Sequence, residues 1–249
     1  MDGLFKPYTF GAAERAQLDH VGHFALPGIL TDSACEQLTA ALAQIQELPR
    51  DDEEYLPSRF AAEFNGYLES LIGHPQLLKL VRRVLGEDMR YDHCVALNRP
   101  GGNGGSNWHS HEYGNDNPAL GFVRVFFYVN GFAEDDGGLK VVPGSHLYRD
   151  AEIRAESDAE LEGGWMAGKV HPETGTELRI EGLSVPEGTV ILMWTHAAHG
   201  VNPRQEESDT RWCVVYAYRN PGEGSRARWL SEEFEKKRIR GAEGLMSLY

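Results

Sequence analysis

Long apolar runs, paired cysteines and an excess of basic side chains are all missing from this sequence. No stretch approaches the roughly 20 apolar residues needed to cross a bilayer. The N-terminal segment lacks the basic start and apolar run of a signal peptide. We therefore expect neither membrane insertion nor secretion. Three cysteines, Cys35, Cys94 and Cys213, lie far apart without metal-type spacing, which favours a reduced, cytoplasmic protein.

The shortage of basic charge excludes a second class of function. The chain has 38 acidic and 24 basic side chains and a formal net charge of −14. Such a chain repels nucleic acid phosphates and anionic lipid, so we expect no nucleic acid and no membrane partner. A small-molecule substrate is expected instead, and the oligomeric state stays open. A length of 249 residues fits a single domain with a substantial core.

Helical patterns come first in the chain and short strands follow. Apolar residues recur at helical spacing in the N-terminal part, about residues 30–86, and strand and turn patterns fill about 89–219. The tail, 221–249, is charged and holds a short helix at most. This order predicts a sandwich or barrel with helices on one side. The predicted helices include 58–72 and 75–85, and the predicted strands are 19–30, 89–100, 106–112, 120–130, 138–142, 183–186, 189–195, 198–202 and 210–219.

One stretch carries most of the candidate chemistry. His109 and His111 are two residues apart on a predicted strand, so their imidazoles project from the same face. An isolated pair of this kind is more often ordinary polar surface. A third histidine, His199, lies far downstream and is followed twelve residues later by Arg211 on another apolar strand. This combination favours a metal site.

The motifs and their order resemble the phytanoyl-CoA dioxygenase family of Fe(II)/2-oxoglutarate-dependent oxygenases. The likeness covers LDHVGHFALPGILTDSACEQL, HPQLLKLVRRVLG, NRPGG, DDGGLKVVPGSH and HGVNPR with a later arginine. It implies a mainly β fold, the cupin-like jelly roll called a double-stranded β-helix, supported by N-terminal helices. It also implies Fe(II), 2-oxoglutarate and O2, and the hydroxylation or other oxidation of a small organic molecule.

The resemblance also assigns roles to single residues. His109 matches the first iron ligand of the family and His199 the distal one. Arg211 matches the arginine that pairs with the far carboxylate of 2-oxoglutarate, a role that suits a guanidinium because it can form two parallel hydrogen bonds. His146 matches a structural loop residue, and His196 is expected outside the ligand set because it points to the opposite strand face.

His111 departs from the family pattern, which places a carboxylate there. Three imidazoles could hold the metal. A nearby carboxylate could instead complete the site, either Glu112 through a bulge or Asp116 from the following loop. The chain could also be a non-catalytic relative that binds a small molecule or a subunit. A further alternative is a three-histidine dioxygenase in which Arg211 anchors an acidic substrate without 2-oxoglutarate. Halogenation is disfavoured, because it needs a small residue at this position.

The remaining pocket candidates are polar or aromatic residues near the histidines. Arg124, Phe126 and Tyr128 alternate along one apolar strand and share a face. A buried Arg124 needs a partner, either a carboxylated substrate or co-substrate, or a buried acidic residue. With Arg211, Asn98 and Phe126 are expected to contact the co-substrate. The expected substrate contacts are Arg59, Arg99, Arg124, Tyr128 and Trp165.

A long polar segment, about 150–182, directly follows the PGSH turn. Structureless segments of this length in compact domains are often active-site lids. We expect it to form a mobile cover that excludes water from the metal face. The alternative is a surface excursion without contact to the pocket.

Overall fold

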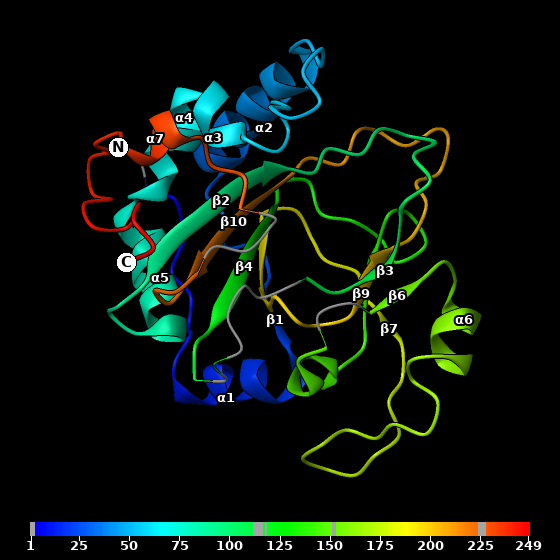
Figure 1. The fold of residues 1–249 in the computed structure, drawn as a ribbon. Coiled ribbons are helices and arrows are strands. Elements are labelled where there is room, and N and C mark those ends of the chain that lie inside the picture. The colour runs from blue at the N-terminus through cyan, green and yellow to red at the C-terminus, as the bar shows by residue number, and fades with distance from the viewer. Residues whose placement is uncertain (1–2, 112–116, 118, 151–152, 224–227) are drawn as a thin grey trace.

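Two antiparallel five-stranded sheets form the framework of the protein, as the computed structural model shows (Figure 1). The structure describes residues 3–111, 117, 119–150, 153–223 and 228–249. The major sheet has the order β1 (His23–Leu26), β8 (Thr189–Trp194), β4 (Phe122–Tyr128), β10 (Cys213–Arg219) and β2 (Arg90–Ala96). The minor sheet has the order β6 (Arg154–Ala155), β3 (Ser106–His109), β9 (His199–Val201), β5 (Leu139–Val141) and β7 (Glu181–Gly182). The predicted jelly roll is confirmed.

Strand β4 shows how alternation sorts side chains between the layers. Its odd-numbered residues, such as Val125 and Phe127, belong to the core shared with the helices. Phe126 and Tyr128 belong to a separate cluster between the two sheets. The central position of β4, paired with β8 and β10 along its whole length, fixes this register. The inner face of β4 therefore forms one wall of the space between the sheets.

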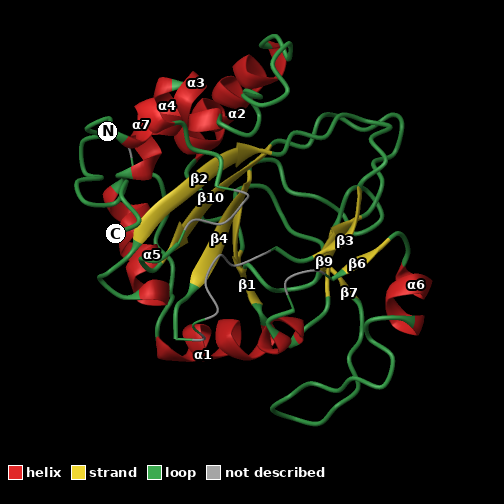
Figure 2. Ribbon diagram, in the orientation of Figure 1, coloured by secondary structure: helices red, strands yellow, loops and turns green. Residues whose placement is uncertain are grey.

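Helices cover the outer face of the major sheet, on the side away from the minor sheet (Figure 2). The predicted helix over 58–72 is wrong in its continuity, because Asn65 adopts an extended conformation and caps the next helix through the backbone amides of Tyr67 and Leu68. The predicted strand over 19–30 is shorter than expected, since a helix occupies its start and ends at Gly22 with φ 98°. The helices are α1 (Ala12–Val21), α2 (Asp32–Glu47), α3 (Ala61–Phe64), α4 (Gly66–Ile72), α5 (Pro75–Leu85), α6 (Asp158–Gly163) and α7 (Glu232–Glu235), with a 3-10 turn at Ser145–Tyr148.

The segment over 150–182 has more structure than its polar sequence indicates. It contains β6, α6 and β7, and its apolar side chains Ile153, Leu161 and Met166 are buried. They pack with Trp108 of β3 in a cluster of their own on the minor sheet. Burial of a few large apolar side chains is enough to hold such a segment, because each contributes about 1.5–3 kcal/mol.

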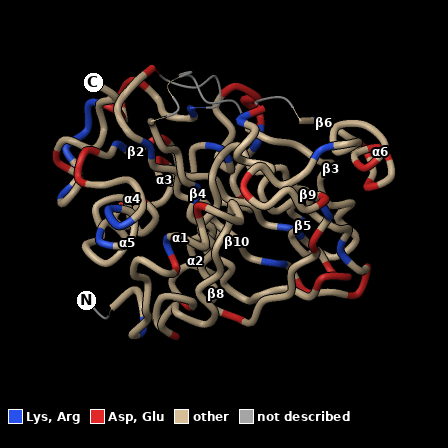
Figure 3. The backbone as a smooth tube through the Cα atoms, turned by 90° about the horizontal axis from the view of Figure 1, so that it is seen from below, with Lys and Arg blue, Asp and Glu red and all other residues tan. Residues whose placement is uncertain are grey.

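Charged side chains are distributed along the whole chain, with acidic positions prominent at α6 (Figure 3). Within the described residues, none of the helices combines the length and the apolar character needed to span a bilayer.

Candidate active site

Three histidines converge where strands β3 and β9 of the minor sheet respectively end and begin. His109 ends β3 and lies directly opposite His199, the first residue of β9. His111 follows two residues later, where its backbone amide donates to the carbonyl of Thr195 at 3.2 Å. The ring centroids of His109 and His199 are 4.2 Å apart. The ring centroid of His111 lies 4.9 Å from that of His109 and 5.1 Å from that of His199. One ligand nitrogen from each ring lies within 4.8 Å of the others, a spacing that suits a shared metal ion.

Backbone carbonyls orient two of these imidazoles. Nδ1 of His109 is 2.8 Å from the carbonyl oxygen of Asn107, and Nδ1 of His199 is 2.9 Å from that of Ala197. A hydrogen on Nδ1 satisfies each carbonyl and leaves the Nε2 lone pair for a metal, the usual arrangement around metal-binding histidines. The same i, i−2 contact fixes each of the two rings, whose planes are inclined to each other by 51°.

Desolvation favours the neutral form of all three imidazoles, of which His109 and His111 are half-buried and His199 is buried. Desolvation is the main cause that lowers the pKa of His111 and of His199 well below the ordinary value of 6.5, and it also lowers the pKa of His109. The positive charge of Arg124 adds to this effect at each ring. Neutral imidazole is the form that binds a metal, so the cluster is ready to bind one at neutral pH.

A cavity of about 350 Å³ opens beside the histidines, between the two sheets. It contains Arg59, Arg99, Arg124, Phe126, Tyr128 and Arg211 of the residues predicted from sequence, together with the three histidines. A larger hollow of about 500 Å³ lies between α1 and the ends of α5 and β8, and none of the three histidines lines it. The smaller cavity is therefore the one that combines the metal-type cluster with buried positive charge.

Arg211 forms the end of the cavity next to Tyr128. Its side chain is 1% exposed, and its guanidinium carbon lies 5.3 Å from the ring centre of Tyr128 and 5.7 Å from that of Phe132. Nη1 donates to the carbonyl of Gly137, and Nε has no hydrogen-bond partner among the described residues. A buried guanidinium with an unsatisfied N–H is poised to bind a carboxylate.

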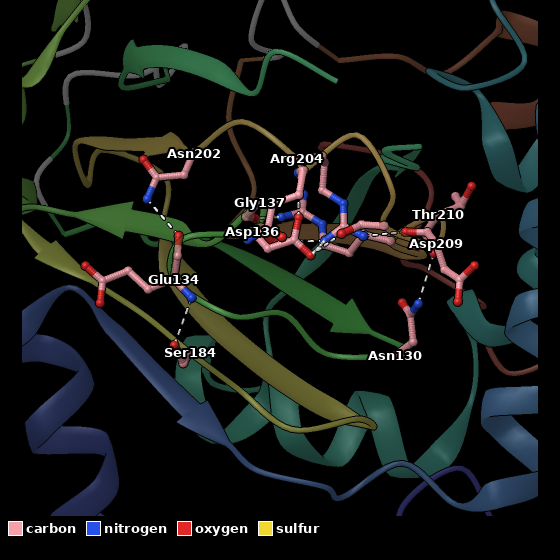
Figure 4. Close-up of polar contacts among 12 residues, drawn as sticks. Asn130, Glu134, Asp136, Gly137, Ser184, Asn202, Arg204, Asp209 and Thr210 are labelled. Atoms are coloured by element: carbon pink, nitrogen blue, oxygen red, sulfur yellow. Dashed lines mark hydrogen bonds and ion pairs between the residues drawn. The ribbon is translucent and has the colours of Figure 1, made fainter. Parts of the chain in front are cut away.

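The DDGG turn, residues 135–138, contains Gly137, whose carbonyl accepts the hydrogen bond from Arg211 (Figure 4). Asp136 accepts hydrogen bonds from the Gln205 backbone and the Ser208 hydroxyl, and its carboxylate pairs with Arg204 at 2.9 Å. Gly137 adopts φ 72° and donates to the carbonyl of Pro203 at 2.9 Å. The turn is thus tied to the HGVNPR segment that follows the third histidine.

Arg99 and Arg124 line the same cavity in different ways. The Arg99 backbone pairs with that of Arg211, and its Nη1 donates to Asn103 and to the Gly105 carbonyl, both at 2.7 Å. These bonds turn its head group towards the glycine-rich turn. Arg124 stays within the cavity wall, where Nε donates to Thr195 Oγ1 at 3.3 Å and Nη1 contacts Nε2 of His93 at 3.3 Å.

Two predicted contact residues lie outside this cavity. The amide of Asn98 donates to the carbonyl of Leu42 at 2.9 Å, because the residue follows the end of β2 and faces helix α2. Trp165 donates to Asp150 at 2.7 Å and packs against Tyr148, so its ring is held beyond the minor sheet. The described residues of segment 150–182 likewise contribute nothing to the cavity lining. The expected cover is corrected to a segment packed on the outside of the sheet, because its apolar side chains are buried there.

Other predicted residues have separate places. Glu112 and Asp116 lie outside the described residues. His146 contacts the carbonyl of Asp19 through Nε2 at 2.7 Å, and His196 lines the larger hollow, so neither belongs to the cluster.

Sequence reasoning missed three residues at the end of the cavity near Arg124. Trp229 lines the cavity, although it belongs to the tail, and its ring centre is 5.2 Å from that of His93. Asp92 and His93 are fully buried on β2. The pair of charged or polar residues inside an apolar strand is the signal that could have identified them.

The chain matches a known protein family over most of its length. Residues 18–207 fit the family described as phytanoyl-CoA dioxygenase (PhyH). The chain belongs to this family. Phytanoyl-CoA dioxygenases use Fe(II), 2-oxoglutarate and O2, and an oxygenase function of this general type follows for the chain. No curated protein sequence gives a significant match.

Several solved structures have the same fold. The non-heme alpha ketoglutarate dependent carbocyclase SnoK from nogalamycin biosynthesis has 16% identity and a TM-score of 0.67 over 92% of each chain. The epimerase SnoN, in complex with Fe3+, alpha ketoglutarate and nogalamycin RO, has 14% identity and a TM-score of 0.63 over 84% of this chain and 82% of its own. HygX from Streptomyces hygroscopicus, with nickel and 2-oxoglutarate bound, has 16% identity and a TM-score of 0.62 over 93% and 94%.

Proposed function

We propose that this phytanoyl-CoA dioxygenase family member oxidises a small organic molecule by hydroxylation, with Fe(II) held by His109, His111 and His199. The convergence of three neutral imidazoles on one point carries the proposal. The buried, partly unsatisfied guanidinium of Arg211 in the same cavity supports binding of 2-oxoglutarate. Iron, when bound, would supply the activation of O2 that organic side chains cannot provide.

The protein's own residues position the reactants. Nδ1 contacts to Asn107 and Ala197 fix two of the ligand rings, so that the metal would meet a preset geometry. Arg211 would take the far carboxylate of 2-oxoglutarate, with Tyr128 and Phe132 shielding the ion pair from water. Desolvation strengthens such a pair and helps to fix the orientation of the co-substrate.

A three-histidine site differs from the usual pattern in charge. A carboxylate ligand would neutralise part of the positive charge of the metal, whereas the neutral imidazole of His111 brings no negative charge. Two alternatives follow from the same residues: a dioxygenase in which Arg211 binds an acidic substrate directly, and a relative that binds a small molecule without turnover. The first keeps the metal and drops 2-oxoglutarate, and the second drops catalysis.

Anaerobic spectroscopy separates these functions. Fe(II) and then 2-oxoglutarate are added to metal-free protein, and iron content is measured in parallel. A visible charge-transfer band that needs both additions supports the proposed function. Bound iron without the band supports the acidic-substrate dioxygenase, and no bound iron supports the binding protein. His111→Ala should lose iron, while the control His74→Asn, which changes the half-buried histidine that caps helix α5 outside the cavity, should retain it.

A further inference from the structure

Arg124 is a buried cation that has no directly paired anion in the part of the chain that the structure describes. It lies on the inner face of β4, is 5% exposed and lines the cavity beside the histidines. Within the described residues, its polar contacts are Thr195 Oγ1 and His93 Nε2, and no carboxylate oxygen lies within 4.0 Å of it. A buried charge in an apolar strand requires compensation, and the neutral partners on this side do not supply it.

A chain of hydrogen bonds holds the guanidinium from behind. Nδ1 of His93 lies 2.7 Å from Asp92 Oδ2, so a hydrogen on Nδ1 leaves Nε2 to accept from Arg124. Asp92 is fully buried and also lies 3.8 Å from Arg219, so its charge is shared between two guanidinium groups. The network fixes the position of Arg124 and, among the described residues, occupies two of its five N–H groups, so that the others can donate to a ligand.

The charges expected in the occupied cavity also favour a negatively charged ligand. Fe(II) brings two positive charges, and the four arginines that line the cavity, Arg59, Arg99, Arg124 and Arg211, add one each, while the three imidazole ligands add none. 2-Oxoglutarate supplies two negative charges, so a positive excess remains around the substrate position. A low-dielectric site with this excess favours an anionic substrate over a neutral one.

The guanidinium groups of Arg124 and Arg211 lie near different ends of β4, since that of Arg124 is 5.8 Å from the ring centre of Phe122 and that of Arg211 is 5.3 Å from the ring centre of Tyr128. Arg124 and Tyr128 are four residues apart on β4, about 13 Å at 3.3 Å per residue, and Arg211 lies against the Tyr128 ring. The two guanidinium groups thus mark opposite ends of the inner face of β4. Trp229 covers the Arg124 end, where Arg59 lies 5.4 Å from the centre of its ring.

We propose that Arg124 binds a carboxylate group of the substrate, and that the enzyme oxidises a small carboxylic acid whose apolar body packs against Trp229 and Phe126. This inference rests on the proposed function for the oxidation itself. The binding of a carboxylate at Arg124 does not depend on the metal, because Thr195 and the His93–Asp92 pair hold the guanidinium.

Calorimetric titration of the metal-free protein with benzoate, and with benzamide as its uncharged counterpart, tests the assignment. The unchanged protein should bind benzoate at least tenfold more tightly than benzamide. Arg124→Met should weaken benzoate binding about 30-fold or more, as expected when one partner of a desolvated charge pair is removed. Arg124→Lys keeps the charge but loses the two-pronged hydrogen-bonding geometry. Its affinity for benzoate should therefore lie between that of the unchanged protein and that of Arg124→Met. Arg211→Met should keep the preference for benzoate.

Several outcomes would overturn the proposal. One is equal binding of benzoate and benzamide by the unchanged protein. Another is that Arg211→Met loses the preference for benzoate over benzamide while Arg124→Met retains it. A fall in 2-oxoglutarate affinity as large as the fall in benzoate affinity in Arg124→Lys would instead assign Arg124 to the co-substrate. Because the titration needs no iron, failure of the spectroscopic test in the preceding section leaves it interpretable.

Discussion

Replacement of Arg211 by methionine is the sharpest test of the co-substrate site. Methionine replaces the aliphatic part of the side chain, but it removes the guanidinium, its charge and its contacts with the rings of Tyr128 and Phe132. Loss of one partner from a buried, hydrogen-bonded charge pair costs about 2–5 kcal/mol, which is about 30-fold to a few thousand-fold in Kd. Because Arg211 is 1% exposed, solvent cannot replace it, and we expect at least 100-fold weaker binding.

The variant also has a cost in stability that must be separated from binding. The carbonyl of Gly137 loses its donor, which costs about 1–3 kcal/mol and corresponds to a fall in Tm of about 2–12 °C for a chain of this size. Binding is therefore measured well below that Tm, by calorimetry of 2-oxoglutarate with the Ni(II)-loaded protein. Arg179→Met, at an exposed arginine outside the cavity, is the matched control. An Arg211→Met protein that is folded and binds 2-oxoglutarate within threefold of the unchanged protein would refute the role of Arg211.

Three further predictions concern the metal, pH and the outer segment. His111→Asp should restore the family ligand pattern and bind Fe(II) at least as tightly as the unchanged protein, measured by anaerobic titration; complete loss of iron would contradict a ligand position at residue 111. Burial lowers the pKa of His23, His146 and His196 to about 4 from 6.5, so each stabilises the metal-free fold above about pH 6.5 and its contribution is lost as the pH falls towards 4. Tm in the presence of a chelator should therefore fall steadily from pH 7 to pH 4.5, and a flat profile would show that these groups do not titrate as their burial requires. Leu161→Ala should cost about 2–5 kcal/mol of stability while 2-oxoglutarate affinity stays unchanged, since Leu161 packs on the outside of the minor sheet; an equal loss of affinity would restore a covering role to segment 150–182.

Local periodicity was enough to predict the sheets but not the periphery. Alternation along β4 correctly indicated that Arg124, Phe126 and Tyr128 share a face, because the period of two is a property of the strand itself. The position of Asn98 was wrong, since the residue follows the end of β2, where alternation no longer determines its direction. Trp229 reaches the cavity through the packing of the tail, which no local pattern encodes.

The buried network behind Arg124 illustrates a second limit. The sequence offered a ligand or an acidic residue as partner for this arginine, and the structure places a histidine between the arginine and Asp92. Such a relay joins β2 and β4, which are both neighbours of β10. Sequence separation says nothing about that adjacency, because the strand order follows from the whole topology.

The lining of the cavity combines parts of the sheets with two peripheral segments. The histidines and Arg211 lie on or beside the sheets, whereas Arg59 and Trp229 come from a loop and the tail. These two peripheral segments are fastened together where Glu63 accepts hydrogen bonds from the Ser231 amide and hydroxyl. Exchange of the two segments as one unit would therefore change which molecules enter the cavity while the three histidines and Arg211 stay in place. The loop with Arg59 and the tail with Trp229 are therefore the segments at which sequence changes would alter substrate selection with the least effect on the two sheets.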